Sequence, residues 1–150
     1  MRRESWSYWL LPALALLVLA GTLGYVALAR GQLPAGPTPV VWDRAACATC
    51  RMHVGEPAFA AQAQLRDGST LFFDDAGCLL GMLPDIEPQV HALWFHHVRE
   101  DRWVRGDAVG FVAVSPSPMG FDLGAVDGGE PGAESLAASR ARLAARWGGR

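Results

Sequence analysis

The sequence predicts an α+β fold, in which a small domain of ββαβ-like units follows an N-terminal transmembrane helix. Three observations carry this prediction. An apolar run without a charged residue extends from Trp6 to Ala29. Period-2 alternation over 59–66 leads through a turn into a second extended run and a short helix. A helical stripe of apolar residues then lies near the C-terminus.

The apolar run predicts an uncleaved membrane anchor over residues 1–30. A helix needs about 20 apolar residues to cross the hydrocarbon core, whereas the apolar region of a cleavable signal has about 7 to 15. Arg2 and Arg3 outweigh the lone Arg30, so the positive-inside rule predicts a cytoplasmic N-terminus and a single-pass protein whose domain lies on the periplasmic or extracytoplasmic side of the cytoplasmic membrane. Ala27-Leu28-Ala29 could alternatively serve as a cleavage site, which would also export the domain.

Residues 31–41 are rich in proline and glycine and predict a short tether ahead of a domain over 42–150. The chain has 150 residues, a net charge of -2 and no lysine. Its arginines form no basic stripe, so nucleic acid is not an expected partner.

The first half of the domain predicts a hairpin followed by a helix. Alternation over 59–66 gives a strand with one apolar and one polar face, Asp67-Gly68 favours a two-residue turn, and 70–73 forms the returning strand. Asp74 and Asp75 offer a helix N-cap rather than an acid/base pair, because no histidine or nucleophile is spaced to work with them. The helix should cover 76–83 and stop near Pro84.

The second half predicts a central strand over 92–99, because both of its faces carry bulky side chains. His96 and His97 alternate along it, so at most one is expected to face inward to any one site. Residues 107–114 could form either a helical turn or a strand. Pro118 stiffens the loop before Met119, and the final helix carries Leu136, Leu143 and Trp147 on one stripe.

The segment 47–53 gathers the most distinctive chemistry of the chain: two thiols, a thioether and an imidazole, from Cys47, Cys50, Met52 and His53. If the chain after Cys50 is extended, Met52 projects on the same side as Cys50, and His53 points the other way. Thiolate and thioether sulfur together favour Cu(I). The segment therefore predicts a copper site, with Met119 as a more distant thioether ligand.

Other interpretations of the cysteines are weighed by spacing. Cys47 and Cys50 could form a disulfide in an oxidising compartment, although this would give the neighbouring Met52 no purpose. A c-type haem needs His directly after the second cysteine, where Arg51 stands, and no second ligand pair completes a structural zinc site. Cys78 and Met82 are four residues apart on one helix and are more typical of core packing, so Cys78 is a lesser metal candidate.

The order of these motifs resembles the NosL family, copper accessory proteins of nitrous-oxide reductase maturation. The pieces are C-x-x-C-x-M at 47–52, the Asp67-Gly68 hairpin, F-D-D-x-G-C at 73–78 and P-M-G at 118–120. The resemblance implies a Cu(I)-binding domain of ββαβ-like units outside the cytoplasmic membrane. By motif position it implies Cys50, Met52 and Met119 as the first ligands and Cys47 as the next. Arg51 departs from the family by replacing a glycine that its members often carry.

The resulting expectation is a non-enzymatic, membrane-tethered Cu(I) metallochaperone. Its expected partners are a copper-requiring reductase, or the membrane machinery that assembles one. Two alternatives remain: a membrane-anchored thiol-disulfide oxidoreductase that uses Cys47 and Cys50, and a metal-free structural subunit of a membrane complex. The oxidoreductase would need its C-x-x-C at a helix N-terminus, whereas Gly55 and Pro57 soon interrupt the chain here.

Overall fold

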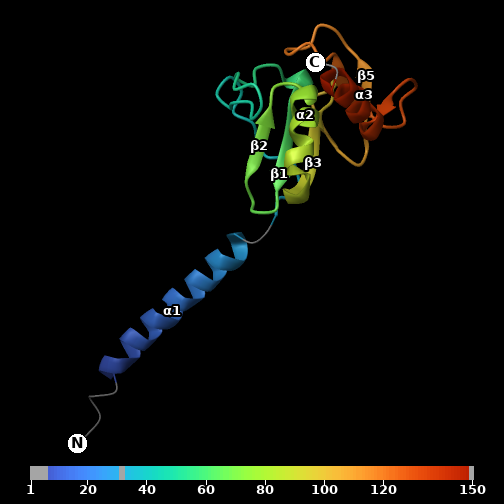
Figure 1. The fold of residues 1–150 in the computed structure, drawn as a ribbon. Helices are drawn as coiled ribbons and strands as arrows, with labels where there is room; N and C mark the ends of the chain where they lie inside the picture. Colours follow the sequence, from blue (N-terminus) through green and yellow to red (C-terminus); the bar gives the residue numbers. More distant parts are fainter. Residues whose placement is uncertain (1–6, 31–32, 149–150) are drawn as a thin grey trace, which may run out of the picture. The chain divides into compact units, whose positions relative to one another are not determined.

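The computed structural model describes residues 7–30 and 33–148, with side chains at 10–26 and 33–145. The chain divides into two compact units, with the boundary between Leu33 and Pro34. The first unit holds helix α1 (Ser7–Arg30), and the second holds every other helix and strand (Figure 1). The predicted topology from Arg2 and Arg3 and the predicted placement of Trp147 concern residues or side chains outside the described part.

The predicted transmembrane anchor is wrong. Among the residues that the structure describes, no helix combines the length and the apolar character needed to span a bilayer. Gly21, Thr22 and Gly24 lower the apolar content of α1.

The second unit is built around an antiparallel sheet in the order β2-β1-β3-β4. Its strands are β1 (Ala61–Leu65), β2 (Thr70–Phe73), β3 (Val90–His96) and β4 (Trp103–Arg105). The predicted hairpin is confirmed, but its turn holds three residues, 66–68, rather than the two predicted: the N–H of Leu65 donates to the carbonyl of Ser69 at 2.8 Å, and Gly68, with a φ of 88°, donates its N–H to the carbonyl of Leu65 at 3.0 Å. β3 lies between β1 and β4, so the predicted central position of this strand is also confirmed.

Helix α2 (Ala76–Ile86) covers one face of this sheet (Figure 1). Asp75 is its N-cap, as the sequence predicts, and its side chain accepts a hydrogen bond from the backbone N–H of Gly77. The predicted stop near Pro84 is wrong, because the helix continues through Pro84 to Ile86. Glu87–Gln89 forms a short 3-10 turn after it, and Pro57–Phe59 forms another before β1.

The opposite face of β1 carries Gln62 and Gln64, which alternation predicts to be a polar face. Both side chains are fully buried, because the proline-rich segment 36–38 lies over them. The amide of Gln62 accepts from the backbone N–H of Thr38 at 2.8 Å and donates to its carbonyl at 3.1 Å, while Gln64 donates to the carbonyl of Gly36 at 2.7 Å. This part of the predicted tether is therefore bound to the sheet.

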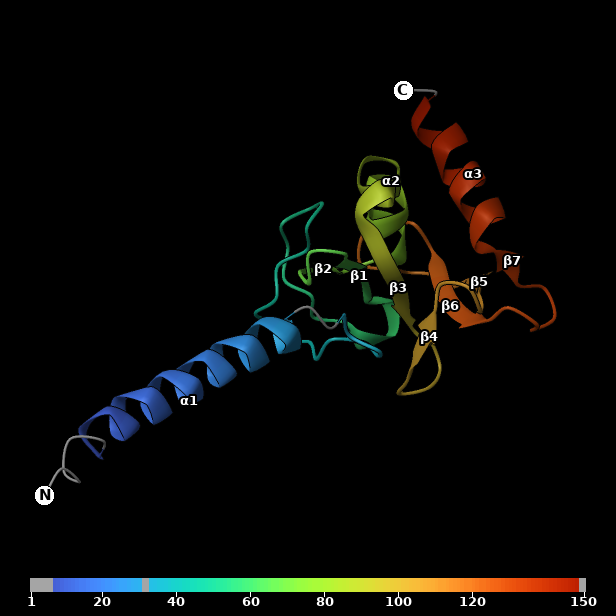
Figure 2. The ribbon, with the colours of Figure 1, turned by 90° about the horizontal axis from the view of Figure 1, so that it is seen from below.

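A second antiparallel sheet, in the order β6-β5-β7, lies next to the first (Figure 2). It consists of β5 (Val109–Ala113), β6 (Leu123–Asp127) and β7 (Glu134–Ser135), and helix α3 (Leu136–Gly148) packs against it. The ambiguous segment 107–114 thus contains a strand. The ββαβ order holds for β1, β2, α2 and β3 but is not repeated here, because the helix follows all three strands.

The core lies between the sheets and helices. Phe95 of β3 meets Phe111 of β5 edge to face, with ring centroids 5.1 Å apart. His96 and His97 are both buried, but their rings lie beside different partners, Asp101 at 3.2 Å and Glu130 at 3.4 Å, so their burial does not conflict with the prediction that at most one of them faces any one site. The first sheet accounts for only one of them: His97 pairs with Ala125 at the edge of the second sheet, which supplies a second buried environment.

Candidate metal centre

The sulfur atoms of Cys47, Cys50 and Cys78 come together at one end of the domain. All three lie within 4.8 Å of one another, and none forms a disulfide. Cys47 and Cys78 are buried, at 0% and 1% exposure, whereas Cys50 is partly exposed. The cluster therefore has two inner thiols and one outer thiol through which a ligand can reach it.

The segment 47–52 forms a tight loop that turns the two C-x-x-C thiols inward. The backbone N–H of Arg51 donates to the carbonyl of Cys47 at 3.0 Å, and the N–H of Cys47 donates to the carbonyl of Met52 at 2.8 Å. Arg51 closes this loop with a φ of 67°, in the left-handed region that favours glycine. The prediction that the chain is extended after Cys50 is therefore wrong at Arg51.

Two further hydrogen bonds fasten this loop to the domain. The backbone N–H of Ala48 donates to the carbonyl of Phe72 in β2 at 2.8 Å, which fixes the loop against the edge of the sheet. The hydroxyl of Thr49 donates to the carbonyl of Cys78 at 2.9 Å. Thr49 thus connects the C-x-x-C loop directly to the helix that carries the third thiol.

Cys78 lies in the first turn of α2, where its backbone N–H donates to the carbonyl of Asp75 at 2.9 Å. Its position depends on Gly77, because a Cβ at Gly77 would lie 2.1 Å from the ring of Phe121. Phe121 follows the P-M-G segment, so this contact packs that loop tightly against the start of α2.

The three thiols differ in their acid–base behaviour. A hydrogen bond from Cys78, aided by backbone N–H groups, lowers the pKa of Cys47 well below its usual range despite burial. Donating that hydrogen bond, together with burial, raises the pKa of Cys78, and burial raises the pKa of Cys50. These shifts favour the thiolate form at Cys47 and the protonated form at Cys50 and Cys78.

A buried carboxylate lies beside this thiolate. Asp74 is 4% exposed, and burial raises its pKa, with the negative charge of Cys47 adding to the effect. The backbone N–H of Gly55 donates to it at 3.2 Å, which partly offsets these effects. A carboxyl group thus lies on the inner side of the centre, and a bound cation would favour its charged form.

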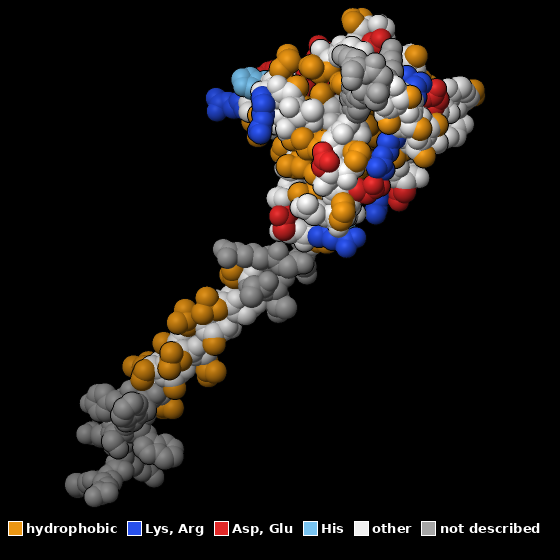
Figure 3. Space-filling model, viewed as in Figure 1, with side chains coloured by type: hydrophobic (Ala, Val, Ile, Leu, Met, Phe, Trp, Pro, Cys, Tyr) orange, Lys and Arg blue, Asp and Glu red, His pale blue; other side chains and the backbone are white. Residues whose placement is uncertain are grey.

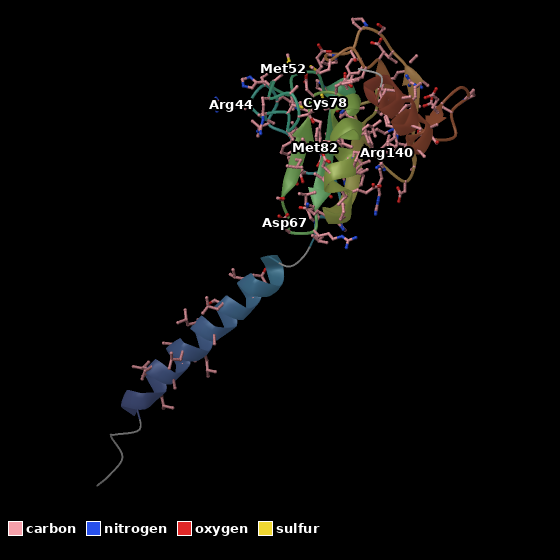
Figure 4. All side chains as sticks on the ribbon, viewed as in Figure 1. Arg44, Met52, Asp67, Cys78, Met82 and Arg140 are labelled. Carbon is pink, nitrogen blue, oxygen red and sulfur yellow. The ribbon has the colours of Figure 1, made fainter. Side chains whose placement is uncertain are left out.

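The two predicted thioether ligands occupy exposed positions. Met52 is 52% exposed, and Figure 4 shows it at the same end of the domain as Cys78. Met119 is 36% exposed, and its backbone N–H donates to the Asp75 carboxylate, at 3.2 Å, at the start of the helix that carries Cys78. Both backbones are therefore fixed close to the thiol centre by hydrogen bonds, while their side chains are open to solvent.

His53 does not join the thiols. It pairs with Ala46 in an isolated bridge and its side chain is exposed, and the potential metal-ligating group at the cysteines, among the described residues, contains no histidine. His97, Asp127 and Glu130 also lie close together, but Arg99 pairs with Glu130 and Arg102 pairs with Asp127. Those carboxylates are already neutralised, so this second cluster is an ion-pair network.

Two residues that support the centre gave no signal in the sequence. Thr49 binds Cys78, and Ser117 donates its hydroxyl to Asp75 at 2.6 Å. Both bonds join segments far apart in the chain, and serine and threonine are too common for either position to stand out.

A scan of family models and searches of curated proteins and of solved structures found no match to this chain, so the resemblance to the NosL family remains a prediction from motifs.

Proposed function

We propose that this protein is a Cu(I)-binding accessory protein that holds copper at Cys47, Cys50 and Cys78. The observation that supports the proposal is the convergence of three sulfur atoms within 4.8 Å from two separate segments of the chain. Soft sulfur donors favour Cu(I), and Cu(I) accepts the low coordination numbers that such a cluster offers. A structural zinc site would need a fourth nitrogen or sulfur ligand.

Met52 and Met119 are proposed as outer thioether ligands that assist entry and exit of copper rather than hold it at rest. Their side chains are exposed, whereas two of the three thiols are buried. Copper would move by ligand exchange: one donor of the acceptor adds as one donor of the centre leaves. The partly exposed thiol of Cys50 is the donor that an acceptor can replace first.

The rival function, thiol-disulfide exchange, fits the burial pattern poorly. An oxidoreductase attacks its substrate with an accessible, low-pKa thiolate. Here the thiol with the lowered pKa is Cys47, which is fully buried, while burial raises the pKa of the accessible Cys50. The cysteine whose pKa is lowered, Cys47, is thus not the cysteine that a substrate can reach, Cys50.

The recipient is proposed from the resemblance to the NosL family: a copper enzyme outside the cytoplasm, in particular nitrous-oxide reductase or the machinery that assembles it. The motifs at 47–52, 73–78 and 118–120 support this narrower assignment. A nitrous-oxide reductase gene beside the gene of this protein would strengthen it, whereas a different copper enzyme there would redirect it.

An anaerobic titration of the reduced full chain with Cu(I), against a chromogenic Cu(I) chelator, tests the copper site. We expect one tightly bound copper per chain. Cys47→Ser and Cys78→Ser should each lower the affinity by more than about tenfold, because each removes an inner donor. Met82→Leu is the matched control, since Met82 is a partly buried methionine on the same helix as Cys78 and is not proposed as a ligand.

Two results would reject the proposal. One is an affinity for Cu(I) that Cys47→Ser and Cys78→Ser leave as high as in the Met82→Leu control. The other is tighter binding of Zn²⁺ than of Cu(I) in a parallel competition. Circular dichroism of each variant identifies any loss of binding that comes from misfolding.

A further inference from the structure

The exposed surface around the C-x-x-C loop carries two arginines whose side chains have no partner. Arg44 and Arg51 form neither an ion pair nor a side-chain hydrogen bond within the described part of the chain. Elsewhere in the domain the arginines that pair with carboxylates are Arg99, Arg102, Arg105, Arg140 and Arg142. Arg66 is the other arginine with a described side chain that has no ion pair, and it donates to the carbonyl of Val90 at 3.4 Å. Two of these three arginines without a carboxylate partner thus lie beside the thiol centre.

These arginines belong to a surface that we call the loop corner: Val41, Arg44, Arg51, Met52 and His53. Figure 4 shows Arg44 and Met52 at one end of the domain, with Asp67 at the other, and Figure 3 shows basic and histidine side chains gathered at that corner. Val41 and Met52 add exposed apolar area, at 62% and 52% exposure. An apolar surface with a basic rim is typical of a protein-docking site.

The acidic residues of segment 41–56, Asp43 and Glu56, flank the loop corner in the sequence, and neither forms an ion pair with a described residue. The carboxylate of Asp43 lies against Gly55, because a Cβ at Gly55 would be 2.8 Å from its oxygen. Segment 44–54 itself contains no acidic residue.

We propose that the loop corner docks a partner protein through an acidic face that presents copper-accepting side chains. An acceptor must reach the centre where Cys50 is exposed, and that opening lies between Arg44 and Arg51 in the sequence. Opposite charges steer such an encounter and fix its orientation. The chain as a whole carries a net charge of -2, so an acidic partner gains no overall attraction from it and depends on local basic side chains. That this partner receives copper rests on the proposed function, whereas the docking itself needs no metal.

The test uses the metal-free full chain and two labelled peptides. Each peptide has a Met-His-Met centre, flanked in one by aspartates and in the other by lysines. Fluorescence anisotropy at low and at moderate salt measures their binding. We expect the acidic peptide to bind at least about fivefold more tightly than the basic one, and the preference to shrink as salt screens the charges.

Arg44→Gln with Arg51→Gln should abolish this preference. The control double variant, Arg66→Gln with Arg105→Gln, removes the same charge from other surfaces and should keep it. Equal binding of the two peptides, or equal loss in both double variants, would overturn the proposal. One further result would overturn the proposal: the chain binds vesicles of phosphatidylserine and phosphatidylcholine through Arg44 and Arg51, while the peptides show no preference. The loop corner would then bind a lipid surface rather than a protein. If the acidic peptide binds but the chain fails the Cu(I) titration, docking stands and the proposed function falls.

Discussion

The hydroxyl of Ser117 donates a 2.6 Å hydrogen bond to the carboxylate of Asp75, a residue 42 positions earlier in the chain. The other oxygen of the same carboxylate caps α2 by accepting from the N–H of Gly77 at 2.8 Å. The backbone N–H of Met119 also donates to Asp75, at 3.2 Å. One fully buried side chain therefore holds both the start of the helix that carries Cys78 and the loop that carries Met119.

Asp75→Asn should lower the free energy of unfolding by about 1–3 kcal/mol, because an amide N–H₂ group would face the N–H of Met119 and leave buried donors unpaired. Urea unfolding of the reduced, metal-free protein measures the change. Asp85→Asn makes the same substitution at an exposed position on α2 and should have little effect. Equal stability of the two variants would contradict the role of Asp75.

The stability of the metal-free domain should rise between pH 6 and pH 8 through Cys47. The pKa of Cys47 is lower in the folded chain than its ordinary value of about 8.5. Below that ordinary value the unfolded chain therefore binds more protons, so stability increases with pH and is lost as pH falls through the folded pKa. The largest slope that one thiol can give is about 1.4 kcal/mol per pH unit.

Urea unfolding of wild type and Cys47→Ser at pH 6, 7 and 8 isolates this contribution. The variant should lose the slope that Cys47 supplies. It keeps Asp74, whose raised pKa contributes with the opposite sign as pH rises through its own range. Parallel pH profiles of wild type and variant would show that Cys47 is not the thiolate.

Arg51→Gly should stabilise the domain by about 0.5–1 kcal/mol. A non-glycine residue in the left-handed region costs about 1–2 kcal/mol, and the greater freedom of glycine in the unfolded chain offsets part of the gain. Arg51→Ala removes the same charge but keeps the Cβ, so it should give no such gain. Thermal unfolding of both variants separates backbone strain from charge, and an equal gain in both would assign the effect to charge.

Gln62→Leu should release the segment 36–38 from the sheet. The substitution leaves the N–H and carbonyl of Thr38 without their partner, at a cost of about 1–3 kcal/mol. Limited proteolysis followed by mass spectrometry should show faster cleavage within 34–41. Gln89→Leu, at an exposed position, is the control and should be cleaved at the wild-type rate. Unchanged cleavage after Gln62→Leu would show that the other contacts hold the segment.

Local patterns predicted the parts of the fold that local chemistry determines. The hairpin at Asp67-Gly68 and the Asp75 cap need only residues close in sequence, and both were found, although the turn holds three residues rather than two. Burial of Gln62 and of His97 depends instead on partners that arrive from elsewhere, the segment 36–38 in one case and β6 in the other. Period-2 alternation cannot reveal that a polar face will be covered.

In the candidate site, too, some residues are identified by local sequence patterns and others are placed by contacts with distant segments. The C-x-x-C spacing identified Cys47 and Cys50, but Cys78 carried only a pattern typical of core packing. Its place beside the other thiols follows from the pairing of the C-x-x-C loop with Phe72 near the end of β2, just ahead of α2, and from the hydrogen bond of Thr49 to Cys78. The fold of that loop also escaped prediction, because Arg51 adopts a backbone conformation that arginine rarely takes.

The separation of the three cysteines along the chain links ligand binding at the thiol centre to folding of the domain. In an unfolded chain Cys78 is remote from Cys47, so a ligand that needs all three sulfurs finds its complete site only after the hairpin and α2 have assembled. Any such ligand would act as a cross-link closing the stretch from 47 to 78, and a loaded molecule would resist unfolding more strongly than an empty one.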